Sequence, residues 1–140
     1  MDGQFLGDAK IVIQSVYLVN EGGETIASVP IGDFQIDEAL FGGFLSAIQM
    51  YSKKISGKNV SELSLENYRI IISKTDRVFL VTIHDLNDKN AAALNSKISE
   101  LCKGTLGEIV TDETIKKIRE AAGEAEGAMK RANEWASKML

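Results

Sequence analysis

Apolar positions along this chain follow two different periods, and the change from one period to the other predicts its elements. Continuous runs rich in β-branched residues, at Ile11–Val19 and Thr25–Val29, are typical of buried strands. Asn20–Glu24 lies between them and contains two glycines, which tolerate the backbone of a tight turn. The sequence therefore predicts a β-hairpin that ends at the only proline, Pro30.

The period lengthens over Ile36–Ser56, where apolar residues recur every three or four positions and predict one apolar helix face. The members of this face are Phe41, Phe44, Leu45, Ile48, Tyr51 and Ile55. Asp33 or Asp37 is suited to cap the start of the helix, and Gly57 is suited to end it. This segment is therefore expected to be the first helix of the chain.

Three further strands are predicted after this helix, at Val60–Leu65, Tyr68–Ser73 and Val78–Ile83. The turns between them are short, which makes neighbouring strands antiparallel. The last two strands are unbroken apolar runs and suit the centre of a sheet. The first is more polar and suits an edge.

Two helices are expected at the end of the chain. Asn87 or Asp88 is placed to cap the first, whose apolar stripe runs to Cys102. The second spans residues 112–140 and repeats apolar residues at heptad spacing. The expected fold is α+β, a five-stranded antiparallel sheet with the order β-β-α-β-β-β-α-α, in one domain over 1–140 with a flexible start at 1–8. One helix is expected on one face of the sheet, and the last two on the other face or at an edge.

Composition excludes several classes of function. The net charge of −4 disfavours a general nucleic-acid binder, because phosphate binding needs surplus lysine and arginine. A single cysteine excludes an internal disulfide and a cysteine-rich zinc site. No apolar stretch approaches the roughly 18 residues that a membrane-spanning helix needs, and the N-terminus does not resemble a signal peptide. A cytoplasmic location is expected, with at most peripheral membrane association through partners.

Three residues are candidates for chemistry, and none of them predicts an enzyme. Lys58 follows Gly57, but the segment lacks the upstream glycine of a phosphate-binding loop and leaves a helix instead of a strand. His84 is expected near the surface at a strand end, and its neighbour Asp85 points to the opposite face. Cys102 is expected to be a core thiol. No catalytic residue, metal ligand or cofactor is predicted.

The order of elements resembles the longin domain, which shares a structural superfamily with roadblock domains. Local segments look similar as well: Asn20–Thr25 resembles the turn after the first strand, Ala39–Ile48 the first helix, and Tyr68–Ile72 with Val78–Val81 the central strands. Roadblock domains usually begin with a helix, and Met1–Lys10 is too short and glycine-rich for one, which favours longin. PAS-like and profilin-like ligand sensors have similar elements and remain an alternative.

The resemblance implies a non-catalytic, dimerising platform for a Ras-like small GTPase or a vesicle-trafficking assembly, with a roadblock-type GTPase-activating scaffold as another alternative. No SNARE motif follows, so a full vesicle SNARE is not expected. Family dimers commonly join through the first helix and the adjacent edge strand. The partner contacts expected there are Phe41, Gly42, Gly43, Val60, Glu62, Leu63 and Ser64.

The terminal helix is a second candidate surface, because its inward face is mostly alanine and buries little area per residue. Packing on its own sheet and binding a partner are both compatible with that pattern. The partner contacts expected on this helix are Ala122, Met129 and Trp135.

Overall fold

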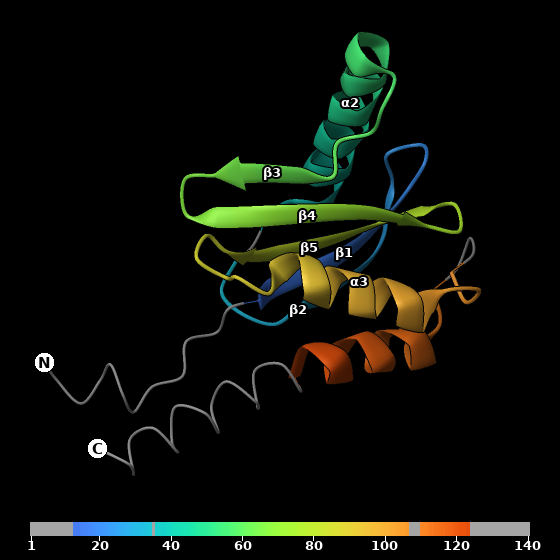
Figure 1. The fold of residues 1–140 in the computed structure, drawn as a ribbon. Helices are drawn as coiled ribbons and strands as arrows, with labels where there is room; N and C mark the ends of the chain where they lie inside the picture. The colour runs from blue at the N-terminus through green and yellow to red at the C-terminus, as the bar shows by residue number, and fades with distance from the viewer. Residues whose placement is uncertain (1–12, 35, 107–109, 124–140) are drawn as a thin grey trace, which may run out of the picture.

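The computed structural model describes residues 13–34, 36–106 and 110–123. Five antiparallel strands form one sheet, in the order β2-β1-β5-β4-β3 (Figure 1). The strands are β1 (Ile13–Asn20), β2 (Thr25–Pro30), β3 (Glu62–Leu65), β4 (Tyr68–Thr75) and β5 (Val78–Asp85). The expected class and element order are confirmed, and the fold is longin-like.

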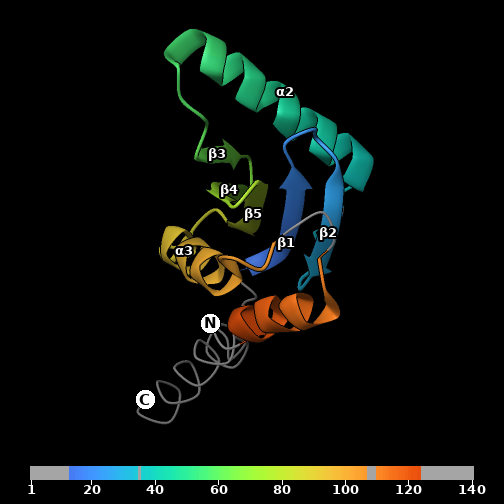
Figure 2. The ribbon, with the colours of Figure 1, turned by 90° about the vertical axis from the view of Figure 1, so that its right-hand side faces the viewer.

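The helices divide between the two faces of the sheet, as expected from the sequence. Figure 2 shows α2 (Glu38–Ser56) on one face, with α3 (Ala91–Cys102) and the helical residues 112–123 on the other. The flexible start predicted at 1–8 and the part of the predicted terminal helix at 124–140 lie outside the described residues. The predicted terminal helix is therefore described only over residues 112–123.

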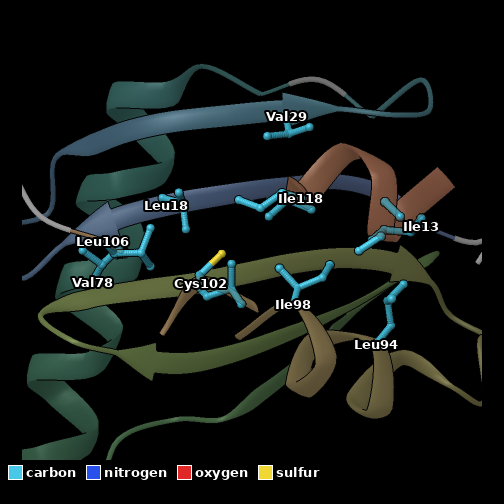
Figure 3. Close-up of a cluster of buried hydrophobic side chains, with 13 residues drawn as sticks. Ile13, Leu18, Val29, Val78, Leu94, Ile98, Cys102, Leu106 and Ile118 are labelled. Atoms are coloured by element: carbon cyan, nitrogen blue, oxygen red, sulfur yellow. The ribbon is translucent and has the colours of Figure 1, made fainter. Parts of the chain in front are cut away.

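Each face of the sheet has its own buried cluster. On the α3 side, Ile13 and Leu18 of β1 cluster with Ile98 from α3 and Ile118 from the last helical segment, and all four are fully buried (Figure 3). Burying a side chain of this size stabilises the fold by about 1.5–3 kcal/mol. The expectation that Cys102 is a core thiol is confirmed, since this residue belongs to the same cluster.

The buried cluster on the α2 side of the sheet is smaller and contains more aromatic residues. Phe41 and Leu45 are the apolar residues of α2 buried in its cluster, with Val81 from the central strand β5 beneath them. The rings of Tyr17 and Phe41 lie 4.8 Å apart between centroids, a separation at which aromatic pairs attract. The first half of α2 is therefore the part that contacts the sheet.

The start of α2 is held by an unusually close approach to the β1–β2 turn. A Cβ atom added to Gly42 would lie 2.2 Å from the carbonyl oxygen of Gly23, so only glycine fits at this point. Gly23 itself has a φ of 86°, a left-handed conformation that favours glycine. Asp37 caps the helix by accepting a hydrogen bond from Leu40 N at 2.9 Å. The turn thus sets where α2 begins and how closely it approaches the sheet.

Several boundary predictions were wrong. Strand β3 begins at Glu62 and not at Val60, and β4 continues past Ser73 to Thr75. Strand β5 continues past Ile83 to Asp85, because His84 still pairs with Ile13 of β1 and Arg69 of β4. Helix α3 begins at Ala91, and neither Asn87 nor Asp88 is its cap residue. Side-chain polarity suggested the end of β5 and the start of α3. Backbone pairing determines the first, and the turn before the helix determines the second.

We expect Gly42→Ala to destabilise the fold by about 1–3 kcal/mol, the usual cost of forcing extra atoms into a packed site. The matched control is Gly43→Ala, because a Cβ there meets nothing within 4 Å. That change should stabilise α2 by up to about 1 kcal/mol. Urea unfolding followed by circular dichroism measures both values. Equal effects of the two substitutions would contradict the role given to the Gly23 contact.

Candidate functional site

An apolar stripe runs along the outer side of α2. Leu40, Tyr51 and Ile55 are 69%, 70% and 70% exposed, and Phe44 is 45% exposed. The full stripe, called the α2 stripe below, is Leu40, Phe44, Ala47, Ile48, Tyr51 and Ile55. Isolated exposed apolar residues are common on proteins, but a continuous row of large ones marks an interaction surface.

The α2 stripe is exposed because of the way α2 crosses the sheet. Figure 1 shows the second half of the helix rising past β3, beyond the sheet edge. The sequence predicted one apolar face for the whole helix, and this was wrong. Phe41 and Leu45 face the sheet, whereas Phe44 and Tyr51 lie on an adjacent face and remain exposed.

A groove of about 440 Å³ follows the α2 stripe. Its walls are Phe44, Ala47, Ile48, Tyr51 and Ser52 from α2, with Val60 from the segment before β3. An apolar groove beside an exposed helix suits an apolar side chain or a second helix.

Gln49 fixes the far wall of this groove. Its buried amide donates to Val60 O at 2.9 Å and accepts from Val60 N at 2.6 Å, so the side chain pairs with this residue as a neighbouring strand would. Ser52 Oγ makes a third tie by donating to Lys58 O at 2.7 Å. The polar position Gln49 carried no signal in the sequence, because an isolated glutamine in a helix is usually solvated.

The edge strand β3 continues the same surface. It pairs with β4 alone in the described part of the chain, and its four residues are largely exposed. Arg69 of β4 holds Glu62 through two contacts, Nε to Oε2 at 2.8 Å and Nη2 to Oε1 at 3.1 Å. The third donor, Nη1, bonds Asp88 O at 2.9 Å. An edge with one free side is open to pairing with another strand.

The predicted partner contacts divide into three groups. Gly43, Glu62 and Ser64 are exposed, and Val60 and Leu63 are partly exposed beside them. A second group is buried within the chain and cannot present side chains to a partner: Phe41, Gly42 and Ala122. Phe41 and Ala122 pack against the sheet, and Gly42 packs against the hairpin turn. Met129 and Trp135 lie outside the described residues.

Sequence reasoning missed the residues that form most of this surface. Leu40, Phe44, Tyr51 and Ile55 were assigned to the buried face or left without a role. A signal was present, since the apolar residues of α2 cover more than the single stripe that packing on one sheet requires.

The prediction that His84 lies near the surface was wrong. His84 is fully buried, with Nδ1 at 2.8 Å from Asp88 Oδ2 and Nε2 at 2.7 Å from the Thr82 hydroxyl oxygen. Asn95 completes the network by donating to Thr82 Oγ1 at 2.9 Å. Burial lowers the pKa of His84, against the opposing effect of Asp88. Both ring nitrogens are engaged inside the protein, which favours a structural role.

The other two candidates for chemistry, Lys58 and Cys102, lie in surroundings that do not activate them. Gly57 ends α2 with a φ of 76° and donates to Lys53 O at 2.9 Å, and the exposed Lys58 follows it. Cys102 is buried, and burial raises the pKa of its thiol, which disfavours the reactive thiolate. Across the described ranges, no group of three His, Cys, Asp or Glu side chains is placed to hold a metal ion. In the same ranges, no helix has the length and apolarity to cross a membrane.

The lowered pKa of His84 predicts a pH dependence of stability. The unfolded chain binds a proton near the ordinary histidine pKa of about 6.5, whereas the folded chain binds it only at lower pH. Stability is therefore full above this pH and is lost as the pH falls towards the folded pKa, by at most about 1.4 kcal/mol per pH unit.

Urea unfolding between about pH 5 and pH 8 tests this, with His84→Gln as the matched variant. The variant is expected to be less stable at every pH, but its stability should change less through this window. His84 is the only histidine of the chain, so its proton resonances report the folded pKa directly. A folded pKa at or above the ordinary value would contradict the assignment.

Comparison with known proteins found similarity in structure only. No family model matches the chain, and no curated relative matches it. One similar solved structure is Myxococcus xanthus MglB, at 24% identity over 62% of this chain and 76% of that chain, with a TM-score of 0.46. A second is an MglB with tetrameric arrangement, at 13% identity over 78% of this chain and 79% of that chain, with a TM-score of 0.45. Neither similarity is close enough to carry an argument about function.

Proposed function

We propose that this chain is a non-catalytic interaction module that dimerises through the α2 stripe and serves as a platform for a Ras-like small GTPase. The observation that carries the dimer is the exposed α2 stripe with its groove. The link to GTPases comes from the resemblance to longin and roadblock domains. The full burial of His84 and Cys102 supports a role without catalysis.

The occupant proposed for the groove is a second copy of the chain, because the α2 stripe is self-complementary. Leu40 and Ile55 lie equally far from the midpoint between Ala47 and Ile48. Phe44 and Tyr51 are also equidistant from that midpoint, so they lie opposite each other when two copies of α2 pack antiparallel. A twofold interface requires this kind of pattern, in which each residue meets a suitable partner and the reverse contact repeats it.

Charges at the two ends of α2 favour the same arrangement. Glu38 lies in the first turn, and Lys53 and Lys54 lie in the last. In an antiparallel pair, the acidic start of one helix lies beside the basic end of the other. The two helix dipoles also oppose each other, which adds a favourable contribution. A parallel pair would place like charges together at both ends.

The β3 edge supports the proposal from a second direction. It lies beside the groove and has a free side in the described part of the chain. In a dimer with its twofold axis at the middle of the α2 stripe, the β3 strands of the two copies could pair, which would bury both strand edges. The packed side chains on both faces of the sheet give no comparable support to a small-ligand sensor.

Phe44→Glu is expected to weaken self-association about tenfold or more, because a charge replaces an aromatic anchor in the groove. The matched control is Met50→Glu, since Met50 is 61% exposed but does not line the groove. Gel filtration with light scattering over a concentration series measures the dimer fraction. A wild-type chain that stays monomeric at high micromolar concentration would exclude the dimer.

The platform role is tested with small GTPases from the same genome, loaded with a GTP analogue or with GDP. We expect the wild-type chain to bind at least one of them, with a preference for one nucleotide state, in a calorimetric titration. The α2-stripe variant Phe44→Glu should bind more weakly if the GTPase recognises the dimer. If the wild-type chain dimerises but binds no GTPase in either nucleotide state, the proposed platform role is refuted and the dimer is not.

A further inference from the structure

A small polar pocket lies on the other side of α2 from the groove. Its volume is about 200 Å³, which is enough for one compact group. Ser46 and Lys53 line it from α2, Asn59 from the segment that follows, Lys74 from β4, and Glu21 from the β1–β2 turn. The chain therefore brings together side chains from four separate segments at this point.

The pocket concentrates positive charge on a chain whose net charge is −4. Lys74 Nζ lies 2.9 Å from Glu21 Oε2, and both side chains remain partly exposed. Lys74 lowers the pKa of Glu21 most, and Arg77 and Lys53 lower it further. Lys53 and Lys74 line the pocket against the single carboxylate of Glu21, which leaves its lining with a surplus of one positive charge.

The lining is also rich in hydrogen-bond donors. Lys53 forms no ion pair within 4 Å in the described ranges, so its ammonium group is available to a ligand. The Ser46 hydroxyl and the Asn59 amide can donate as well. The floor is Phe79, which is nearly buried, and Lys74 Nζ lies 5.6 Å from the centre of its ring. This cation–π contact helps to hold the ammonium group in place.

We propose that this pocket receives a carboxylate side chain of a protein partner, and that Glu21 occupies the Lys74 end of the site until the partner displaces it. Glu21 is suited to that part because it lies on an exposed turn and its contact with Lys74 is half-exposed. The choice of a carboxylate follows from Glu21, whose own carboxylate already lies against Lys74 in the pocket. The inference rests on the proposed interaction role, but its site is separate from the α2 stripe.

The test uses the full chain and a blocked glutamate, N-acetyl-glutamate amide, with the neutral blocked glutamine as the matched ligand. Both are titrated at constant ionic strength, and backbone amide shifts are followed by NMR. Blocked glutamate should shift the amides around Ser46, Lys53, Asn59 and Lys74, and blocked glutamine should not. Inorganic phosphate is titrated in parallel, and binding tighter than that of blocked glutamate would overturn the choice of carboxylate.

Two substitutions give opposite expected results. Lys74→Gln should weaken the binding of blocked glutamate about two- to fivefold, the range expected for an exposed ion pair. Glu21→Gln should strengthen it by a similar factor, because the internal competitor is removed. Lys116→Gln, on an exposed position of the last helical segment, should change nothing.

Equal shifts with both blocked amino acids, or weaker binding by Glu21→Gln, would overturn the proposal. Circular dichroism confirms that each variant is folded. Phe44→Glu separates this result from the proposed function: a monomeric variant that still binds blocked glutamate leaves the pocket intact. A dimer that does not bind the probe refutes the pocket alone.

Discussion

The contact between Gly23 and Gly42 is the constraint from which the surface of this protein follows. The backbones of the β1–β2 turn and α2 meet at a distance that excludes any side chain. This contact, with Phe41 and Leu45 beneath, anchors only the first half of α2 to the sheet. The second half extends past β3 (Figure 1), and both of its flanks remain open. The apolar groove lies on one of these flanks, and the basic pocket lies on the other.

A helix that leaves the sheet needs a second support, and Gln49 provides it. Its amide forms two hydrogen bonds with the backbone of Val60, so the helix and the segment leading to β3 hold each other. Each such bond contributes about 1 kcal/mol net, and leaving the buried Gln49 amide without partners would cost more. The groove wall is therefore already in place before any partner arrives, which lowers the entropy cost of binding.

Sequence reasoning predicted the fold well because the strands and helices of this chain differ clearly in period. It could not predict which apolar residues of α2 are exposed, because Phe41 and Phe44 carry the same periodic signal. Their burial depends on the angle at which the helix crosses the sheet. The pairing of His84 with Asp88 was missed because it depends on the turn between β5 and α3. Glu21 and Lys74 are far apart in sequence, and only the strand order brings them together.

The two flanks of α2 differ in the kind of recognition they can support. The apolar stripe offers area and symmetry, and the free energy of burying it suits a permanent contact with an identical chain. The basic pocket offers charge on a small, half-exposed site, where each ion pair contributes little to affinity but disfavours a wrong partner. A helix with a self-complementary flank and a charged flank can hold a dimer together with one side and select a different protein with the other. Because Gly23 and Glu21 belong to the same β1–β2 turn, the contact that positions α2 also positions the carboxylate of Glu21 at the pocket.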